Sequence, residues 1–371
     1  MSVGDRRVRA AVLQRVGEPL TMEEIELAET GPDQVRVRMG ASGVCHSDLS
    51  VQNGTIPFLF PTVLGHEGAG VVDEVGSDVT RVAVGDHVVL SWNPPCRRCP
   101  DCLAGQPMLC SVGLGEMFAS PYASLGGVPL VRGLGIGTFA EAALVPERSL
   151  VPIDRAVPLE LAALVGCALA TGVGAVIRTA RLAPGSTVAV IGCGGVGLSV
   201  IQGAKLAGAR QIVAVDTLAQ KLPLALQLGA TDTVDSSATD PVEAVRELTG
   251  GRGVDVAFEV VGRSATIRQA FLLARRGGTA VLVGAGSPED AVTFNAMELF
   301  AEAKSIHGCV YGSTDPDRDF PLLVELVQGG QLDAAALVTR RIDLGDVNEA
   351  FAAMEAGEVA RSVIVFDAGR D

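Results

Sequence analysis

A glycine-rich turn between a strand-like and a helix-like segment constrains the fold of this chain more than any other feature. The apolar run at 188–191 continues into Gly192, Gly194, Gly195 and Gly197, and a helix-like stretch follows directly. Glycines in such a turn let the backbone approach a pyrophosphate, which then lies at the N-terminus of the helix. The pattern therefore predicts a βαβ unit that binds a dinucleotide.

An acidic residue at the end of the next apolar run strengthens this interpretation. Asp216 ends the run at 211–216, and an acid roughly 20 residues after such glycines accepts the ribose hydroxyls of a dinucleotide. A carboxylate there also repels a 2′-phosphate, and no arginine follows it immediately. We therefore expect NAD rather than NADP as the cofactor.

The apolar runs after Pro158 extend this unit into a larger α/β region. They alternate with helix-like stretches, as expected for a buried parallel sheet with crossover helices. The runs occupy residues 187–192, 211–216, 254–261 and 279–284. The region extends to about Ser305, and the remainder predicts two helices and a closing strand. These last elements are expected at 320–328, 347–356 and 361–366.

The N-terminal part has a different pattern. Residues 7–90 form short strand-like segments separated by Gly, Pro and Asp turns, which favours a mostly β, barrel-like domain. A second domain also suits the length of 371 residues, which exceeds the usual size of a single core. Residues 92–135 show no sustained periodicity and are too long for a plain loop. Something must hold that stretch in place.

The charge of the chain limits its partners and location. A formal charge of −14 repels phosphate backbones and anionic lipid headgroups. Residues 1–20 contain no apolar signal core, and no apolar run is long enough to span a bilayer. We expect a cytoplasmic protein with no nucleic-acid or membrane partner.

Four closely spaced cysteines are candidates for holding the long loop. Cys96, Cys99, Cys102 and Cys110 all lie within it. Four thiolates from one segment are typical of a closed, structural zinc site, and metal binding supplies folding energy directly. A chance group of free thiols is the alternative. In the cytoplasm, metal chemistry is a better explanation than a disulfide framework.

Three further segments carry a resemblance to a known family. Residues 65–79 contain Gly-His-Glu followed by spaced glycines and a closing valine, and 43–48 and 166–172 match further motifs. With the four-cysteine loop and the glycine turn, these motifs cover nearly the whole chain in collinear order. The sequence thus resembles the zinc-containing medium-chain alcohol dehydrogenases. His46 and the run at 133–141 are similar to the class III, aryl-alcohol and thiol-dependent formaldehyde dehydrogenase branches.

The resemblance implies both the fold and the domain boundaries. It implies an α/β protein with a GroES-like, mostly-β catalytic domain and a Rossmann cofactor domain built on a doubly wound parallel sheet. We expect the zinc-binding catalytic domain at residues 1–168 and 307–371, and the NAD-binding domain at 169–306.

The resemblance also implies a catalytic zinc, which makes two zinc ions per subunit with the structural one. Its ligands would be Cys45, His66 and Cys167, with water or substrate fourth. Spacing alone would not unite residues so far apart. Asp48 is expected to orient His66 from outside the ligand set, and Glu67 to approach the metal during ligand exchange. Buried structural residues or solvated acids are the alternatives.

Further cofactor contacts follow from the same resemblance. Arg361 and His46 match positions that contact the pyrophosphate, and Arg263 matches one on the adenosine side. Solvated surface cations are the alternative for Lys221 and Arg263. The expected cofactor-binding residues are His46, Thr171, Gly192, Gly194, Gly195, Val196, Gly197, Asp216, Lys221, Arg263, Val283 and Arg361.

The implied reaction is reversible hydride transfer from a primary alcohol to NAD, which gives an aldehyde. Ser47 would take the alcohol proton. Ser50 stands where many relatives have histidine, and a serine hydroxyl cannot act as a base near neutral pH. Trp92 matches a pocket-wall position, and Phe118 and Tyr122 lie in the loop after the last of the four cysteines. The expected pocket contains Ser47, Trp92 and Phe118 and favours an aromatic or allylic substrate, although packing roles explain the aromatics equally well.

Several alternatives stay open from sequence alone. One is a thiol-dependent formaldehyde dehydrogenase of the same family. Another is a zinc-free reductase-like member, and a third is a cofactor-binding scaffold without catalysis. By analogy with relatives we expect a homodimer or homotetramer, joined through the edge of the cofactor-domain sheet near residues 304–312.

Overall fold

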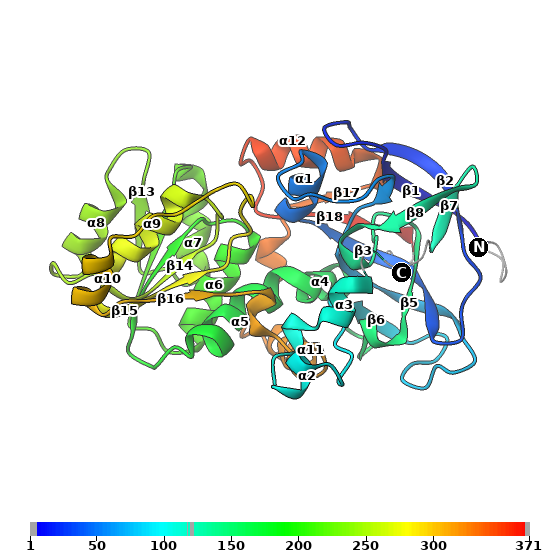
Figure 1. Ribbon diagram of the computed structural model, residues 1–371, viewed down its shortest axis with the longest axis horizontal. Helices are drawn as coiled ribbons and strands as arrows, with labels where there is room; N and C mark the ends of the chain where they lie inside the picture. Colours follow the sequence, from blue (N-terminus) through cyan, green and yellow to red (C-terminus); the bar gives the residue numbers. More distant parts are fainter. Residues whose placement is uncertain (1–5, 117, 119–121, 368–371) are drawn as a thin grey trace. The chain divides into compact units, whose positions relative to one another are not determined.

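The computed structural model describes residues 6–116, 118 and 122–367, and Figure 1 traces them. The chain groups into two compact units. The first contains the described residues within 1–167, 315–328 and 334–371, and the second contains 168–314 and 329–333. Each unit has its own cluster of buried apolar side chains.

Antiparallel strands dominate the first unit. Five strands close into a barrel in the order β1-β2-β7-β8-β4, and a second sheet has the order β10-β6-β5-β3-β18-β17, with β9 also paired to β3. The strands are β1 (Arg7–Leu13), β2 (Thr21–Leu27), β3 (Gln34–Val44), β4 (Thr62–Val63), β5 (Glu67–Val75), β6 (His87–Leu90), β7 (Ala123–Leu125), β8 (Val128–Arg132), β9 (Ala142–Pro146), β10 (Leu150–Ile153), β17 (Arg340–Ile342) and β18 (Ser362–Val365). The helices are α1 (His46–Gln52), α2 (Pro100–Leu103), α3 (Ser111–Glu116), α4 (Leu159–Leu164), α11 (Pro316–Gln328) and α12 (Val347–Glu355).

The late strand β18 completes the sheet that carries the metal-site candidates. It pairs antiparallel with β3, from Ser362 opposite Val44 to Val365 opposite Ala41. Residues near the C-terminus therefore lie beside the end of β3, directly before Cys45.

A six-stranded parallel sheet forms the second unit, in the order β13-β12-β11-β14-β15-β16. Its strands are β11 (Thr187–Ile191), β12 (Gln211–Asp216), β13 (Asp232–Asp235), β14 (Val254–Glu259), β15 (Ala274–Leu282) and β16 (Ser305–Gly308). Its helices are α5 (Ala170–Gly174), α6 (Gly195–Leu206), α7 (Leu222–Leu228), α8 (Pro241–Leu248), α9 (Ser264–Leu273) and α10 (Ala296–Glu302). Among these helices, α6 contacts both α5 and α7, and α8 contacts α9.

The fold class expected from the sequence is confirmed: a mostly-β unit accompanies a doubly wound parallel sheet. The central strands β11 and β12 are almost entirely buried, because helices cover parallel sheets on both faces. Their apolar runs were therefore visible in the sequence. The expected late elements correspond to α11, α12 and β18.

The unit boundaries differ from the expected domain boundaries. Residues 307–314 and 329–333 group with the second unit, whereas we expected them in the first. Strand β16 joins the parallel sheet, and the Thr314 hydroxyl donates to the carbonyl of Ala170 at 3.1 Å. The Asp333 N–H donates to Gln202 Oε1 at 2.7 Å. These contacts hold both segments to the second unit.

Within the described residues, no single helix is long and apolar enough to cross a membrane. In the described part of the chain, one bent pair of helices, at 159–166 and 168–180, meets that criterion when the two are taken together.

Candidate metal and cofactor sites

The three expected ligands of the catalytic metal come from three separate segments of the first unit. Cys45 follows β3 and immediately precedes α1. His66 immediately precedes β5, and Cys167 lies in a π-helical turn, Val165–Leu169. Such turns are rare and frequently occur at functional sites.

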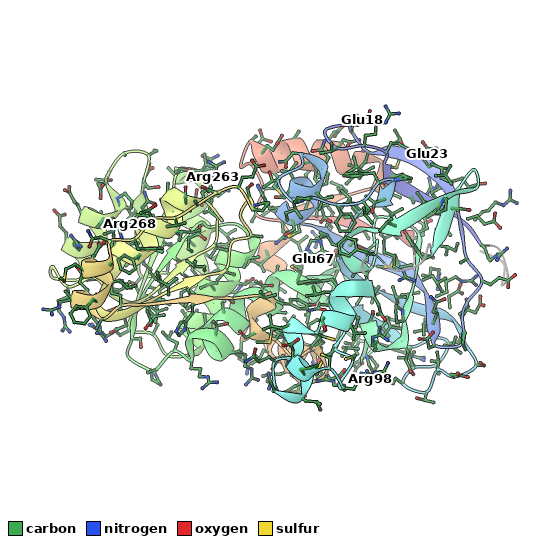
Figure 2. The ribbon with its side chains drawn as sticks, viewed as in Figure 1. Glu18, Glu23, Glu67, Arg98, Arg263 and Arg268 are labelled. Atoms are coloured by element: carbon green, nitrogen blue, oxygen red, sulfur yellow. The ribbon has the colours of Figure 1, made fainter. Side chains whose placement is uncertain are left out.

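The structure brings these residues together. The ligand atoms of Cys45, His66, Glu67 and Cys167 all lie within 4.8 Å of one another, and all four side chains are buried. Glu67 is labelled in Figure 2. Two thiols, an imidazole and a carboxylate in a buried cluster are a donor set that suits zinc. The residues therefore fit the metal that the sequence led us to expect.

Two glycines make room for this cluster. A Cβ on Gly43 would lie 2.0 Å from a carboxylate oxygen of Glu67, and a Cβ on Gly65 would lie 2.5 Å from the ring of Phe139. Gly65 also has φ +93°, which side chains with a Cβ rarely adopt. Both the close approach of Phe139 and the positive φ therefore require glycine at the position before His66.

Asp48 connects the metal-site candidates to one another. Its Oδ1 lies 3.1 Å from Nδ1 of His66 and accepts a hydrogen bond from the Gly65 N–H at 2.9 Å. Its Oδ2 accepts from the Cys45 N–H at 3.2 Å. Because a carboxylate only accepts, it favours the His66 tautomer with a proton on Nδ1, which leaves Nε2 free for a metal. The geometry is the one expected for an orienting acid.

A buried arginine balances the negative charge of this cluster. Arg361 donates to the carbonyl of Val44 at 2.9 Å, and its guanidinium lies 3.5 Å from Glu67. A hydrogen bond from Cys167, together with the charges of Arg361 and His66, holds the pKa of Cys45 well below its usual value. That thiol is therefore available as a thiolate, the form that binds metal.

Glu67 is the member of the cluster whose hydrogen bonds are not satisfied. Burial raises its pKa to about 7, although the charge of Arg361 opposes that shift. Neither carboxylate oxygen has a hydrogen-bond partner among the described residues. Since buried carboxylates normally have such partners, Glu67 is suited to accept a cation at this position.

The four cysteines of the second candidate site also converge. The sulfur atoms of Cys96, Cys99, Cys102 and Cys110 lie within 4.8 Å of one another, and none forms a disulfide. The N–H groups of Cys96 and Gly113 point at the Cys110 sulfur, at 3.2 and 3.3 Å. N–H donation to sulfur stabilises thiolates, as a structural zinc site requires. The donor set fits zinc here as well.

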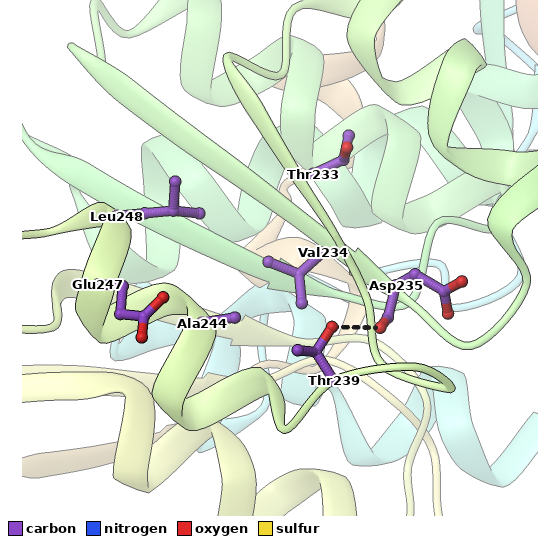
Figure 3. A pocket seen from close by; sticks show the side chains of 7 residues that line it. All are labelled: Thr233, Val234, Asp235, Thr239, Ala244, Glu247 and Leu248. Carbon is purple, nitrogen blue, oxygen red and sulfur yellow. Dashed lines mark hydrogen bonds between the residues drawn. The ribbon is translucent and has the colours of Figure 1, made fainter.

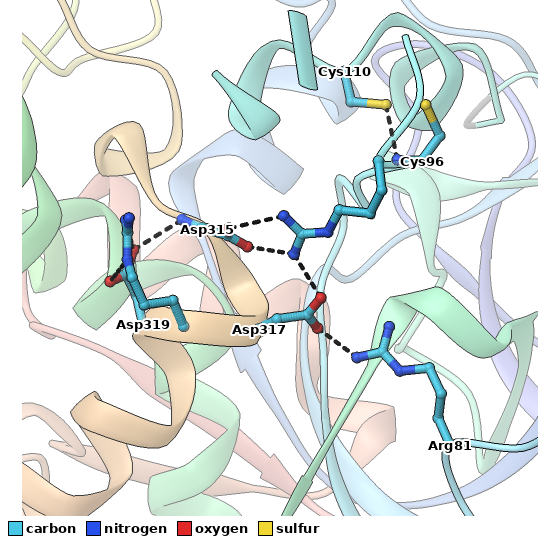
Figure 4. A network of polar contacts seen from close by, with 8 residues as sticks. Arg81, Cys96, Cys110, Asp315, Asp317 and Asp319 are labelled. Atoms are coloured by element: carbon cyan, nitrogen blue, oxygen red, sulfur yellow. Dashed lines mark hydrogen bonds and ion pairs between the residues drawn. The ribbon is translucent and has the colours of Figure 1, made fainter. Parts of the chain in front are cut away.

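An ionic network that the sequence did not predict anchors this loop (Figure 4). Arg97, between two of the cysteines, donates to both carboxylate oxygens of Asp315, at 2.8 and 2.5 Å, and to Asp317 at 2.5 Å. Arg81 also binds Asp317. The partners are more than 200 positions apart in the chain, so local patterns carry no signal for them.

The cofactor candidates of the second unit surround the turn after β11. Gly192 has φ +96°, and a Cβ on Gly197 would lie 1.8 Å from the Gly192 carbonyl oxygen. A Cβ on Gly194 would meet no atom within 4 Å. The turn is therefore tight on one side and open beside Gly194, directly before α6 begins at Gly195. This arrangement fits a pyrophosphate at the helix N-terminus.

Asp216 lies next to this turn and orders it. One of its carboxylate oxygens accepts from the Cys193 N–H at 2.7 Å and the other from the Leu218 N–H at 2.9 Å. Each oxygen keeps a further lone pair for a ribose hydroxyl. Lys221 follows in a short helical turn, Ala219–Lys221.

The other expected cofactor residues occur in both units. Thr171 lies in α5, Val196 in α6, Val283 directly after β15, and Arg263 directly before α9 (labelled in Figure 2). His46 begins α1 in the first unit. Their contacts with a nucleotide stay predictions, as does the pyrophosphate contact of Arg361.

The expected proton carrier, Ser47, lies beside the metal cluster. Its hydroxyl is 3.9 Å from the sulfur of Cys45.

The aromatic residues considered for the substrate pocket differ in how far they are exposed. Phe118 is 52% exposed and packs against Phe58 at a centroid distance of 5.3 Å, and Trp92 is half-buried against the core of the first unit. Tyr122 is 1% exposed beneath the guanidinium of Arg132. Tyr122 is therefore a core residue, which is the packing role that the sequence left open for it.

A surface pocket elsewhere in the second unit contains none of these residues. It lies between β13 and α8, where the Thr239 hydroxyl donates to the Asp235 carbonyl at 3.2 Å (Figure 3). Its lining residues are Thr233, Val234, Asp235, Thr239, Ala244, Glu247 and Leu248. They include no thiol or imidazole, so this pocket is not a candidate for the metal chemistry.

Two family models match the chain. The model described as "Alcohol dehydrogenase GroES-like domain" matches residues 31–155, and the model described as "Zinc-binding dehydrogenase" matches residues 195–329. The first match covers both groups of cysteines except Cys167, and the second covers the glycine turn from Gly195 onward.

Similar proteins cover nearly the whole chain. An S-(hydroxymethyl)glutathione dehydrogenase of Synechocystis is 39% identical over 96% of this chain and 99% of its own. An NDMA-dependent alcohol dehydrogenase of Amycolatopsis methanolica is 37% identical over 98% of this chain and 100% of its own. The structure of benzyl alcohol dehydrogenase from Acinetobacter calcoaceticus matches with a TM-score of 0.91 and 34% identity, over 97% of this chain and 99% of its own.

Proposed function

The chain belongs to the zinc-containing medium-chain alcohol dehydrogenase family, and from that premise we propose that it oxidises a primary alcohol to an aldehyde with NAD as hydride acceptor. The observation that carries the proposal is the buried cluster of Cys45, His66, Glu67 and Cys167, whose ligand atoms lie within 4.8 Å of one another. A zinc ion held there would act as a Lewis acid and lower the pKa of a bound alcohol.

The side chains around that cluster have separate tasks in this proposal. Asp48 holds His66 in the tautomer that presents Nε2. The Ser47 hydroxyl, 3.9 Å from the Cys45 sulfur, relays the alcohol proton: it accepts that proton while it donates its own onward. Ser50 is 7% exposed and cannot replace the histidine of other members as a base, so the proton passes on to water.

NAD is the proposed cofactor because of the charge at Asp216. Its carboxylate is ordered by two backbone N–H groups and keeps lone pairs for both ribose hydroxyls. A 2′-phosphate at the same place would be repelled. The glycine turn beside it supports dinucleotide binding.

We propose two zinc ions per subunit, one in each sulfur-containing cluster. Metal analysis of dialysed protein should give about two zinc per subunit. A Cys110→Ser variant should keep about one and lose thermal stability, because a structural zinc contributes folding energy. A Cys45→Ala variant should also keep about one zinc but retain the melting temperature of the wild type. Metal-free wild-type protein would support a reductase-like member instead.

An aromatic or allylic alcohol is the substrate class we favour. The support is a relative that acts on benzyl alcohol and shares the fold at a TM-score of 0.91. The partly exposed pair of Phe58 and Phe118 adds apolar surface in the first unit. The second candidate is thiol-dependent formaldehyde oxidation, because a 39% identical relative is named for S-(hydroxymethyl)glutathione.

One experiment tests substrate class, cofactor and thiol dependence together. The zinc-loaded protein is assayed for NADH or NADPH formation with a panel of primary, allylic and benzylic alcohols, and with formaldehyde in the presence and absence of glutathione. We expect activity with benzylic or allylic alcohols and NAD. Activity only with formaldehyde plus thiol would select the second candidate. No activity at full zinc occupancy would support a non-catalytic scaffold.

We further propose that the chain forms a homo-oligomer through the edge of its parallel sheet. Strand β16 pairs only with β15 among the described strands, which leaves one edge of its backbone available. Nearby, α10 exposes large apolar side chains, with Phe300 81% and Met297 67% exposed. Such residues on a surface favour a protein interface, and a second copy is the expected partner.

A further inference from the structure

Glu259, at the end of β14, is a buried acid that none of the reaction steps above uses. Its register neighbour is Ile191, the last residue before the glycine turn. Its Oε1 accepts hydrogen bonds from the N–H groups of Val261 and Gly262, at 2.9 and 2.8 Å, and from the Thr266 hydroxyl at 2.7 Å. Three donors on one carboxylate oxygen fix the turn that follows β14.

The backbone of Glu259 also fixes a second turn. Its carbonyl oxygen accepts from the N–H groups of Val283 and Gly284, at 2.8 and 3.0 Å. The two turns then meet without side chains between them: a Cβ on Gly284 would lie 2.2 Å from the Gly262 nitrogen, and a Cβ on Gly262 would lie 2.7 Å from the Ala285 backbone. Glu259 therefore holds both turns, one through its side chain and the other through its backbone carbonyl.

These turns reach the cofactor candidates of the second unit. A Cβ on Gly192 would lie 2.8 Å from a methyl group of Val261, so the first turn packs against the glycine turn. The Thr266 hydroxyl, held by Glu259, also contacts the backbone N–H and carbonyl of Arg263, at 3.3 and 2.9 Å. Val283 begins the second turn. A shift at Glu259 would move three segments at the carboxyl end of the sheet together.

We propose that Glu259 is a positioning residue for the dinucleotide, because its carboxylate sets the shape of the turns at 260–263 and 283–286 against which the nucleotide binds. The inference rests on the proposed function, since NAD is the ligand concerned. The charge is buried, and Oε2 has no hydrogen-bond partner among the described residues. Burying a carboxylate is costly, and the hydrogen bonds that Oε1 accepts from the turn and from Thr266 offset that cost.

The test compares NADH binding by the zinc-loaded wild type with that of Glu259→Ala, Glu259→Gln and a control, Asp240→Ala. Asp240 caps α8 in the same unit through two N–H groups, at 2.8 and 3.0 Å, and its side chain touches neither turn. Loss of charge-assisted hydrogen bonds should raise the Kd of Glu259→Ala for NADH about 10-fold or more. KM for NAD should rise in parallel, and kcat at saturating NAD should stay within about threefold.

The Glu259→Gln variant tests whether the hydrogen bonds of the side chain or its charge position the turns. Glu259→Gln keeps an oxygen for the three donors, so its Kd should stay within about 1.5-fold of the wild type. Asp240→Ala should bind NADH as the wild type does. An unchanged Kd in folded Glu259→Ala, or an equal loss in Asp240→Ala, would overturn the inference.

A second variant covers the case in which Glu259→Ala does not fold. Thr266→Val removes one donor and keeps the side-chain shape, and its Kd should rise about threefold. An unchanged Kd there would also overturn the inference. Failure of the wild type to bind NADH would refute the proposed function and this inference with it, whereas wild-type binding with unaltered variants refutes this inference alone.

Discussion

Asp48 makes three contacts, and each one holds a different part of the metal site. It faces Nδ1 of His66 and accepts from the N–H groups of Gly65 and Cys45. An acid that orients a metal ligand from outside the ligand set also tunes the basicity of that ligand. Removing the charge of Asp48 should therefore weaken metal binding, although all of the metal's ligands stay in place.

We expect Asp48→Asn to weaken zinc binding at the Cys45 cluster about 10- to 100-fold. An amide presents a donor where one of the three contacts needs an acceptor. Competition with a chromophoric chelator measures the affinity. Asp154→Asn is the control, because Asp154 accepts an N–H on the surface of the same unit. Equal zinc affinity in Asp48→Asn and the control would contradict the assigned role.

The two serines after Cys45 should differ in importance. A positioned group that takes a proton in the transition state contributes about 10²- to 10⁴-fold to the rate, so Ser47→Ala should lower kcat by that order. Ser50→Ala should change kcat by less than about threefold, because in the proposed route the proton passes from Ser47 to water and not through Ser50. Steady-state kinetics with the best alcohol of the panel measures both. Comparable losses in the two variants would count against Ser47 as the proton carrier.

Some residues of the site could be grouped from local spacing in the sequence, and others could not. Spacing alone united the four cysteines and joined Asp216 to the glycine turn, because each set is local. Uniting Cys45, His66 and Cys167 required the family resemblance. The contact between Arg361 and Glu67 depends on the pairing of β18 with β3, which no local pattern reports. For Tyr122 the sequence left a pocket role and a packing role open, because burial cannot be read from one aromatic in a glycine-rich stretch.

Among the elements, burial decided which strands the sequence revealed. The runs that predicted β11, β12, β14 and β15 are apolar because the strands are central or largely covered. The outermost strands β13 and β16 are short, and their burial is only partial. Edge strands need fewer apolar residues, so their signal in the sequence was too weak to predict them.

The loop of the four cysteines is held by α11 as well as by its thiols. Arg97 and Arg81 bind Asp315 and Asp317 at the start of that helix. These pairs are partly exposed, so each one contributes modestly. Together, these ion pairs should slow the local opening of the four-cysteine loop, and they should change the free energy of unfolding of the whole unit little.

We expect the double variant Asp315→Asn, Asp317→Asn to release the structural zinc about two- to tenfold faster than the wild type, with the second zinc unaffected. Two-phase zinc release into a chelator, followed by absorbance, separates the ions. Glu160→Gln is the matched control, because Glu160 makes an equally exposed bidentate pair with Arg341. If the control accelerates release as much, the network has no specific role.

At the scale of the whole molecule, the proposed oligomer depends on one apolar surface. We expect the wild type to elute as a dimer or tetramer in size-exclusion chromatography with light scattering. Charges introduced by Met297→Glu and Phe300→Glu should shift it toward the monomer, since charges are costly at an interface core.

Leu226→Glu provides the control for that prediction. Leu226 is an apolar residue of the same unit, 46% exposed on α7. It should leave the mass unchanged. A monomeric wild type, or equal dissociation in the control, would refute the proposed interface.

The sequence predicted two domains, but it did not predict every position at which the chain crosses from one unit to the other. The second unit also takes up residues 307–314 and 329–333, because β16 and the contacts of Thr314 and Asp333 lie beyond the last apolar run. Discontinuous units are set by long-range pairing. Periodicity along the chain does not record that pairing.

The pairing of β18 with β3 has a consequence for the order in which the protein is made. Arg361 hydrogen-bonds the carbonyl of Val44, 317 positions earlier, so a growing chain on the ribosome exposes Cys45 and His66 long before their closing strand exists. The parallel sheet, from 187 to 308, emerges earlier and can fold as a unit. The four cysteines lie within one short segment and can capture zinc at once. The strand that pairs with β3 beside Cys45 therefore forms only when synthesis is almost complete.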